Sequence, residues 1–210
     1  MEEKLLQSVK TYFTDKLNAH GPTPLGVDWN TQEAQEIRFI QIHNFLHADS
    51  DEFSLVDFGC GYGALLSYLR DRGMNCRYIG YDIVPEMIAQ ARVLHEADKK
   101  AEFICDGAVR TDCDYSVGSG VFNQKGESSH QDWTDYVVEN LNTINDHSRK
   151  GFAFNFLTSY SDKEKMRADL YYADPCFLFD LCKRNYAKNV AILHDYGAYE
   201  FTLIVRKELI

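Results

Sequence analysis

The sequence has no long apolar run and no paired-cysteine motif. A membrane-spanning helix needs about 18 or more predominantly apolar residues in a row, and no segment approaches that length. The amino terminus, Met1-Glu2-Glu3-Lys4, lacks the basic and apolar regions of a secretory signal. The six cysteines have no C-x-x-C spacing, and several lie in apolar runs where a thiol acts as a small hydrophobe. We therefore expect a cytoplasmic protein with reduced thiols and no membrane contact.

Positive charge is also scarce in this chain. Its 22 lysines and arginines are outnumbered by 32 aspartates and glutamates, which gives a formal net charge of -10 at pH 7. A net negative charge of this size repels phosphate backbones and disfavours sequence-independent binding of nucleic acid. We expect a small-molecule substrate and no nucleic-acid partner. The sequence leaves the oligomeric state open, a homodimer included.

The order of apolar segments predicts the fold class. Strand-like and helical stretches alternate from Phe53 onward, which is typical of a mainly parallel sheet with helices on both faces. Only a few residues around Gly197 join the last two strands, too few for a parallel crossover, so the last strand should run antiparallel to its neighbours. We expect an α/β three-layer sandwich with a mixed seven-stranded sheet. Its strands are expected at 53–58, 78–81, 102–105, 115–122, 151–157, 189–193 and 199–206.

The segment before this alternation has a different character. Asn30 with Glu33 resembles a capping box, which predicts a helix that begins there and follows an earlier amphipathic helix and a turn-rich stretch. We expect 1–50 to form a helical segment ahead of one globular unit formed by 51–210. The side chains that the second helix is expected to turn toward the core are Ala34, Ile37, Ile40 and Leu46.

A glycine-rich loop follows the first expected strand directly. It reads DFGCGYG at 57–63, and with Ala64 it also fits G-x-G-x-x-A, the dinucleotide-binding fingerprint. Glycine allows the backbone to approach a ligand without a Cβ in the way. The alternative is a tight turn between strand and helix that binds nothing.

The next two expected strands each end at an aspartate. Asp82 stands 19 positions after Gly63, where a carboxylate can accept hydrogen bonds from both hydroxyls of a ribose. Asp106 follows the third strand, where a carboxylate could reach the amino group of an adenine lying across the strand ends. Either aspartate alone could be a helix cap. The glycine loop and the two aspartates follow three successive strands, and this agreement favours a site for an adenosine-containing ligand over separate caps.

These segments together resemble the successive motifs of class I S-adenosylmethionine-dependent methyltransferases. The resemblance runs from about Phe53 to the C-terminus and is carried by VDFGCGYG at 56–63, YDIVPEMI at 81–88 and Asp106-Gly107. In that family the glycine loop lies against the methionine part of the cofactor, and the two acids meet ribose and adenine. The family is Rossmann-like and ends in an antiparallel hairpin, whereas NAD-dependent dehydrogenases normally continue with parallel strands. A dinucleotide-dependent oxidoreductase and an inactive cofactor-binding subunit stay as alternatives.

The resemblance implies S-adenosylmethionine as cofactor and contacts to it from the strand ends. The segment 1–50 resembles the helical lid of several small-molecule methyltransferases of this family. Asp57 would orient the loop or lie near the cofactor's ammonium, or else be satisfied by backbone donors. Arg38 could pair with the cofactor's carboxylate or an anionic substrate group, or else lie on a solvated face. The residues expected to bind the cofactor are Asp57, Gly59, Cys60, Gly61, Gly63, Asp82, Ile83, Asp106, Gly107, Ser119 and Arg38.

The sequence indicates the acceptor of the methyl group less clearly than it indicates the cofactor. We expect transfer to oxygen or nitrogen of a metabolite, sugar or natural-product intermediate. A hydroxyl acceptor must lose its proton, whereas a neutral amine needs chiefly positioning. His194 is the first candidate for a general base and His20 the second, although an isolated histidine is more often structural. The side chains expected to line the acceptor pocket are Trp29, Asn123, Tyr171, Tyr172 and Tyr196.

Two sharper signatures are missing. Neither Asn-Pro-Pro-Tyr nor Asp-Pro-Pro-Tyr occurs, which disfavours the DNA enzymes that methylate amines. No Asp/Asp/Asn triad of the catechol type can be placed, and we expect no metal ion.

Overall fold

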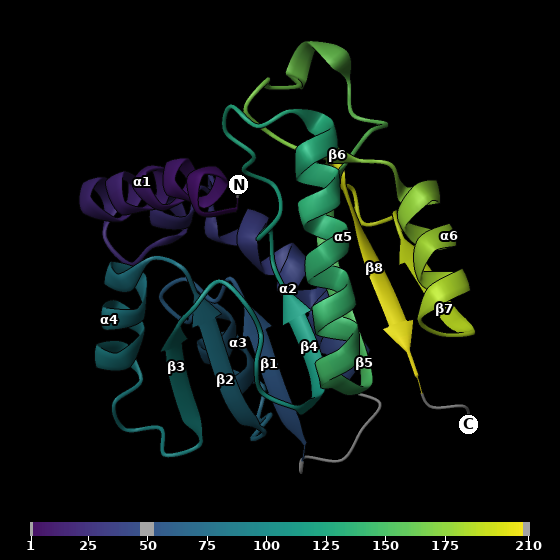
Figure 1. The fold of residues 1–210 in the computed structure, drawn as a ribbon. Coiled ribbons are helices and arrows are strands. Elements are labelled where there is room, and N and C mark those ends of the chain that lie inside the picture. The colour runs from purple at the N-terminus through teal and green to yellow at the C-terminus, as the bar shows by residue number, and fades with distance from the viewer. Residues whose placement is uncertain (1, 47–52, 208–210) are drawn as a thin grey trace.

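An eight-stranded sheet forms the centre of the protein. The computed structural model describes residues 2–46 and 53–207 (Figure 1). The sheet has the order β3-β2-β1-β4-β5-β8-β7, and the short β6 pairs with β5. The strands are β1 Ser54–Phe58, β2 Arg77–Asp82, β3 Ala101–Cys105, β4 Cys113–Gly118, β5 Ser148–Thr158, β6 Tyr172–Ala173, β7 Asn189–Leu193 and β8 Glu200–Arg206.

The direction of the last strand confirms the expected topology. β8 runs antiparallel to both β5 and β7, whereas β1 pairs with β2 and β4 in parallel. Two details differ from expectation. The fourth strand ends at Gly118 rather than at Phe122, because the chain turns at Gly120 with a φ of 71°. β6 is an additional two-residue strand between the strands expected at 151–157 and 189–193.

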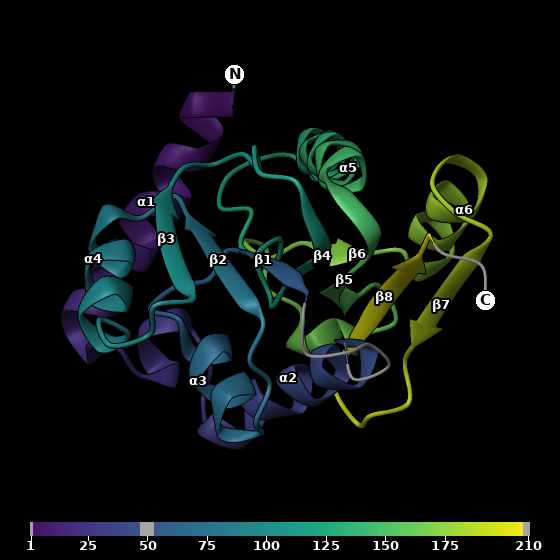
Figure 2. The ribbon, with the colours of Figure 1, turned by 90° about the horizontal axis from the view of Figure 1, so that it is seen from below.

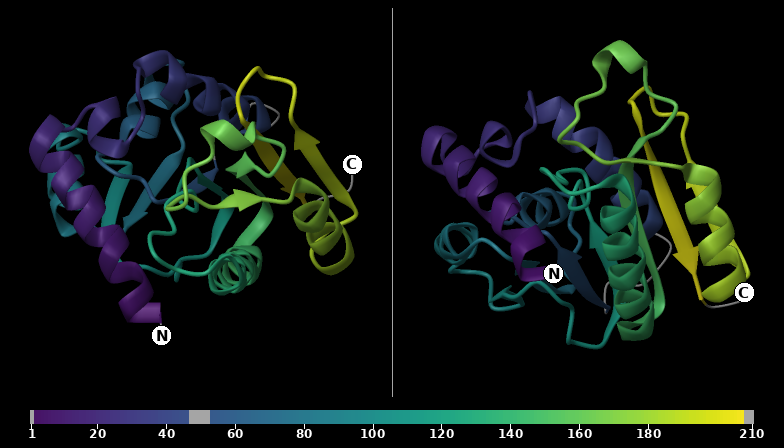
Figure 3. Two further views of the ribbon diagram at one scale, coloured as in Figure 1. Left: turned by 90° about the horizontal axis from the view of Figure 1, so that it is seen from above. Right: turned by 45° about the horizontal axis from the view of Figure 1, so that its top comes forward.

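Helices cover both faces of the sheet, so the three-layer sandwich is confirmed. Helices α5 and α6 lie on one face, α2 and α3 lie on the other, and α4 lies beside the edge strand β3 (Figure 2). Helix α1 crosses the carboxyl ends of the strands (Figures 1 and 3). The helices are α1 Glu2–His20, η1 Pro24–Val27, α2 Gln32–Leu46, α3 Ala64–Asp71, α4 Pro85–Leu94, α5 His130–His147, η2 Lys163–Lys165 and α6 Pro175–Asn185.

The side-chain alternation of β5 separates the two halves of the core. Phe152, Phe154 and Phe156 point to one face, where they pack with α5 and α6. Ala153 points to the other face, toward α2 and α3. Successive residues of a strand point to opposite faces. The larger aromatic side chains are thus concentrated under α5.

Helix α2 departs from its expected burial pattern. It begins at Gln32 and is capped by Thr31, whose Oγ1 accepts from Ala34 N at 3.1 Å, rather than by Asn30. Of the four side chains expected in the core only Leu46 is buried, and Ile40 is 42% exposed. Gln35 and Arg38 are buried in this helix, and polar residues on a buried face hide the helical periodicity of the apolar ones. The expected boundary near residue 50 lies outside the described residues.

Parallel registers bring three strand ends to one level. Phe58 pairs with Tyr81 across β1 and β2, and Asp82 pairs with Cys105 across β2 and β3. The residues that follow these strands therefore meet at one edge of the sheet. Across 2–46 and 53–207, no helix combines the length and apolar character that a bilayer crossing requires.

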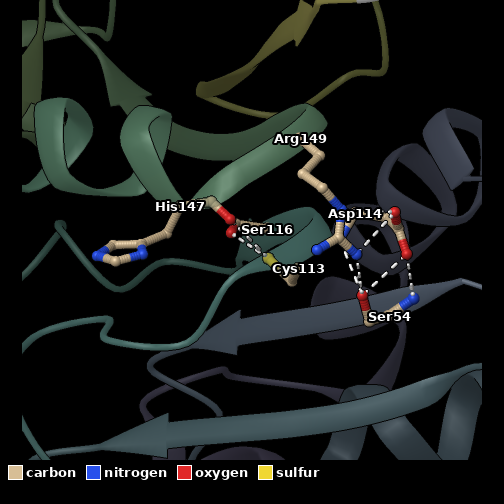
Figure 4. Close-up of polar contacts among 6 residues, drawn as sticks. All are labelled: Ser54, Cys113, Asp114, Ser116, His147 and Arg149. Carbon is tan, nitrogen blue, oxygen red and sulfur yellow. Dashed lines mark hydrogen bonds and ion pairs between the residues drawn. The ribbon is translucent and has the colours of Figure 1, made fainter.

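Polar contacts fix the opposite edge of the sheet. Asp114 accepts from Ser54 N at 2.8 Å and Ser54 Oγ at 2.9 Å, and Arg149 pairs with it at 3.1 Å (Figure 4). The His147 side chain points away from Cys113 and Ser116 in this view and pairs with Asp112 instead. The serine, cysteine and histidine of this cluster therefore hold strands together and do not form a nucleophile and base.

Candidate active site

A cavity of about 110 Å³ lies at the carboxyl ends of the strands, under helix α1. Its walls are mostly apolar and aromatic, with three carboxylates among them. The glycine loop, Asp82 and Asp106 all line it, so the three expected strand ends do meet around one space. The sequence-predicted residues that line the cavity are Trp29, Asp57, Gly59, Cys60, Gly61, Asp82, Ile83, Asp106 and Ser119.

The glycine loop owes its shape to left-handed backbone. Gly59 has a φ of 78°, and a Cβ built there would lie 2.5 Å from Val121 Cγ2. Any other residue would be strained and would also push on the turn after β4. The loop is tied to β2 because Gly59 N and Cys60 N both donate to Tyr81 O, at 2.8 and 2.9 Å.

Asp82 joins this loop to the end of β2. Its Oδ2 accepts from Gly61 N at 2.8 Å and its Oδ1 from Val84 N at 2.9 Å. Burial raises the pKa of the Asp82 carboxyl, although the backbone N–H groups counteract this. An ionised carboxylate has about four acceptor positions, so two backbone donors leave room for ligand hydroxyls.

Asp57 lies deeper, beneath the same loop. Burial raises its pKa to about 7, the Tyr78 hydroxyl lowers it by hydrogen bonding and the nearby Asp82 charge raises it. Tyr78 donates that bond to Oδ2 at 2.5 Å. Asp57 is thus held by a side-chain donor and carries a proton far more readily than an ordinary aspartate.

Asp106 is the most open of the three carboxylates. Its Oδ1 accepts from Ala108 N at 3.0 Å and its Oδ2 from Arg110 Nε at 2.9 Å. Burial tends to raise the pKa of Asp106, but these donors outweigh it and the pKa is lowered. Asp106 therefore stays ionised at neutral pH.

Ser119 lies where β4 has just ended. Its Oγ is buried and has no hydrogen-bond partner in the structure, and the residue lines the cavity. Buried polar atoms are rarely left unpaired. An unpaired hydroxyl that lines the same cavity as the three carboxylates fits a polar ligand group bound there.

Comparisons with known proteins agree with this geometry. Residues 55–147 match a family model described as a methyltransferase domain. A protein of Mycobacterium tuberculosis (strain ATCC 25618 / H37Rv), named "Putative methyltransferase Rv1506c", is 54% identical over 158 residues, which are 75% of this chain and 95% of that protein. The chain belongs to the class I S-adenosylmethionine-dependent methyltransferases.

Solved methyltransferase structures share the fold of this methyltransferase. The N-methyltransferase NodS from Bradyrhizobium japonicum WM9, in complex with S-adenosylhomocysteine, has a TM-score of 0.67 at 13% identity and covers 94% of this chain and 97% of its own. The 1,6-didemethyltoxoflavin-N1-methyltransferase of Burkholderia thailandensis has a TM-score of 0.63 at 12% identity, over 98% of this chain and 89% of its own. S-adenosylmethionine is therefore the cofactor, and the oxidoreductase alternative is wrong.

Both predicted general bases lie away from the cavity of the methyltransferase. His194 is exposed after β7, with its ring 6.2 Å from that of Tyr160 and 5.9 Å from that of Phe201. His20 is exposed at the end of α1. Neither is among the lining residues. Within the described part of the chain, no group of three or more His, Cys, Asp or Glu side chains is placed to hold a metal ion.

Arg38 has a different partner from those expected. Its Nε and Nη2 each lie 2.6 Å from a carboxylate oxygen of Glu200, and both residues are buried. The alternative of a solvated face is therefore wrong. The guanidinium charge is neutralised inside the protein, and Arg38 does not line the cavity. Gly63 and Gly107 also lie outside the lining; Gly63 precedes α3, and its carbonyl contacts His95 Nε2 at 3.1 Å.

Of the predicted acceptor-pocket residues, only Trp29 lines the cavity. Tyr171 is buried against α5, where its hydroxyl lies 3.1 Å from Thr134 Oγ1. The Tyr172 hydroxyl accepts from the backbone N–H of Arg167, and Asn123 Oδ1 accepts from the backbone of β5. The Tyr196 hydroxyl accepts from Thr202 Oγ1 at 3.2 Å. Each of these four has a structural partner that its position in the sequence did not reveal.

The cavity wall includes residues that were not predicted. The amphipathic pattern of α1 was recognised, but not that its apolar side chains would face a ligand cavity rather than the core. The Gln35 side chain of α2 contacts the hydroxyl of Tyr62, which belongs to the glycine loop. The unpredicted lining residues with large side chains are Leu6, Phe13, Gln35, Phe39, Phe58, Tyr62, Leu65, Met87, Trp133 and Tyr136.

Proposed function

We propose that this enzyme transfers a methyl group from S-adenosylmethionine to a neutral nitrogen atom of a small-molecule acceptor bound beneath α1. The observation that carries the proposal is the cavity in which the glycine loop, Asp82, Asp106 and the unpaired Ser119 hydroxyl face one another. The cofactor supplies an electrophilic methyl carbon on a positively charged sulfur. The chain must bind the donor, exclude water and align the acceptor with that carbon.

The strand ends supply groups suited to each part of the donor. Asp82 would accept from the ribose hydroxyls, and Asp106 from the adenine amino group. The backbone of Gly59 and Gly61 would lie against the methionine part. Asp57, whose pKa is about 7, would respond to the donor's ammonium by losing its proton.

The chemistry of the wall favours nitrogen over oxygen as the acceptor atom. No histidine or lysine lines the cavity in the part of the chain that the structure describes. Burial raises the pKa of the Cys60 thiol and of the Tyr62 hydroxyl, so neither is an effective base at neutral pH. Of the three carboxylates in the lining, Asp57 already accepts from the Tyr78 hydroxyl beneath the glycine loop and is proposed to neutralise the donor's ammonium. Asp82 and Asp106 each accept from two protein donors, and their remaining acceptor positions are proposed to bind the ribose and the adenine. A neutral amine needs no base before it attacks, whereas a hydroxyl does.

We also propose that α1 and η1 together form the lid. Leu6, Val9 and Phe13 of α1 line the cavity directly. Asp28, the residue after η1, connects the two parts of the lid. It accepts from the Tyr12 hydroxyl of α1 at 2.7 Å and pairs with Lys16 Nζ of α1 at 2.6 Å. Helix α2 packs against α3, β5 and β8 and belongs to the sandwich.

The test combines donor binding with a search for the acceptor. Calorimetry should detect binding of S-adenosylhomocysteine and none of NAD; the reverse result would overturn the proposal. Fractionated cell metabolites are then incubated with labelled S-adenosylmethionine, and S-adenosylhomocysteine release and the labelled product are followed by mass spectrometry. The product should carry the label on nitrogen. A label on oxygen would refute the proposed acceptor, and donor binding without turnover would favour an inactive subunit.

A further inference from the structure

A chain of buried polar contacts connects α2 and the C-terminal strand with the turn after β4. Arg38 is 8% exposed and Glu200 1% exposed, and the two form a two-bond ion pair at 2.6 Å. Glu200 Oε2 also accepts from Asn155 Nδ2 at 2.6 Å. Asn155 Oδ1 in turn accepts from Gly120 N at 3.0 Å. The contacts therefore run from α2 through β8 and β5 to the 119–121 turn.

A second set of contacts connects Arg38 with the same turn through Trp29. The Arg38 guanidinium lies 3.8 Å from the ring centre of Trp29, a distance typical of a cation–π contact. A Cβ built on Gly120 would lie 2.6 Å from Trp29 Cζ2, so the indole lies directly on that glycine. Trp29 and Gly120 both line the cavity. Both sets of contacts therefore fix adjoining parts of one wall.

This arrangement is poorly explained by stability alone. Removing two charges from water is costly, and well-packed apolar side chains often replace a buried ion pair without loss of stability. What apolar side chains in place of the pair cannot supply is the acceptor for Asn155 Nδ2, which orients Asn155 so that its Oδ1 accepts from Gly120 N in left-handed backbone with a φ of 71°. They also cannot supply a flat cation against the indole. Both functions concern the shape of the cavity wall.

We propose that Arg38, Glu200 and Asn155 form a positioning unit for methyl transfer. They hold the 119–121 turn and the Trp29 indole on the acceptor side of the cavity, and thereby set the alignment of the acceptor with the methyl carbon. Because Glu200 neutralises Arg38, this wall presents an indole and not a free cation to the acceptor. The inference rests on the proposed function and adds the residues that shape its acceptor side.

The test uses two variants that remove the unit in different ways. Asn155→Leu removes the bond to Gly120 N and leaves the ion pair. Arg38→Met with Glu200→Met replaces the pair by apolar side chains of similar length. In both, we expect the dissociation constant of S-adenosylhomocysteine to stay within about threefold of that of the unaltered enzyme. We expect kcat for the acceptor fraction that supports turnover to fall by roughly 10-fold to 100-fold, as small misalignments do.

A matched control separates positioning from stability. Arg70 and Asp98 form an ion pair at 2.7 Å in which both side chains are largely buried, and Arg70 also bonds the carbonyls of Met74 and Cys76 away from the cavity. Arg70→Met with Asp98→Leu should lower the melting temperature at least as much and leave kcat unchanged. If kcat falls equally in this control, or is unchanged in both test variants, the positioning role is wrong.

A second readout does not depend on the acceptor or the donor. The chain has two tryptophans, so Trp133→Phe leaves Trp29 as the only one, and its emission reports on the wall. In that background the test variants should increase acrylamide quenching of Trp29, and the Arg70 control should not. Unchanged quenching in the test variants would overturn the inference even if donor binding succeeds. Failure of the unaltered enzyme to bind S-adenosylhomocysteine would reject the proposed function instead.

Discussion

Replacing Asp57 by asparagine should stabilise the protein at neutral pH and have little effect at acidic pH. Asp57 is 2% exposed and lies beneath the glycine loop, where the Tyr78 hydroxyl is its hydrogen-bond donor. Asparagine has nearly the same shape and can still accept from Tyr78. The substitution therefore removes the buried charge while it keeps the packing and the hydrogen bond.

The magnitude follows from the pKa of Asp57 in the folded protein. Burial first, and the Asp82 charge in addition, raise it from 3.8 to about 7. The folded state thus holds a proton between these values that the unfolded state has released, so the free energy of unfolding falls as pH rises across this window. At about 1.4 kcal/mol for each pH unit, the fall amounts to about 4 kcal/mol. That is roughly 10 °C in melting temperature for a chain of this size.

The assay is urea unfolding of both proteins without ligand, followed by far-ultraviolet circular dichroism from pH 4 to pH 8. The difference in unfolding free energy should be near zero at pH 4 and should grow to about 4 kcal/mol in favour of Asp57→Asn at pH 8. Asp114→Asn is the control with the opposite sign. Burial tends to raise the pKa of Asp114, but donors from Ser54 and Arg149 outweigh it and lower the pKa, so this variant should be the less stable one at pH 8. A difference for Asp57→Asn that does not change with pH would refute the reasoning.

Three further substitutions test other parts of the site. Asp82→Ala removes the acceptor for Gly61 N and the proposed ribose contact, and calorimetry should show the dissociation constant of S-adenosylhomocysteine raised by roughly 10-fold to 100-fold; unchanged affinity would exclude Asp82 from the donor site. Gly59→Ala places a Cβ against Val121 on left-handed backbone and should lower the unfolding free energy by about 1–3 kcal/mol in urea titrations, whereas a neutral result would mean that the loop adjusts freely. His194→Ala should leave kcat unchanged because this histidine is exposed outside the cavity lining; a large loss would restore it as a base.

The strand-end part of the cavity, where we propose that the donor binds, could be predicted because its residues lie at or directly after the ends of strands. Asp82 and Asp106 are the last residue of β2 and the first residue after β3, and parallel register alone brings them to the same edge as the glycine loop. The rule that ligands bind at the carboxyl ends of parallel strands needs no knowledge of side-chain packing. Strand direction was equally accessible, since the short connection at Gly197 permits only an antiparallel pair.

The part of the cavity wall around Trp29, where we propose that the acceptor binds, could not be predicted because its residues meet through tertiary packing. Arg38 and Glu200 are 162 positions apart, and nothing in the composition of α2 or β8 indicates that the two would pair. A charged residue on a helix is ordinarily taken as solvent-exposed. Apolar side chains such as Ile40 were therefore expected on the buried face of α2, where the structure instead has Gln35 and Arg38.

The same difference explains why the histidine and tyrosine assignments did not locate the cavity wall. Residue type suggested His194 and Tyr171, since a base and aromatic side chains are what an acceptor pocket requires. The structure places neither in the cavity lining. Tyr171 is buried against α5, next to the short strand β6, and His194 is exposed in the connection after β7. The aromatic side chains that line the cavity include Trp29, which lies against Gly120 in the turn after β4, and Trp133 and Tyr136 of α5. On the proposed function, the strand ends would hold the donor, and the 119–121 turn with the residues behind it would shape the cavity for the acceptor.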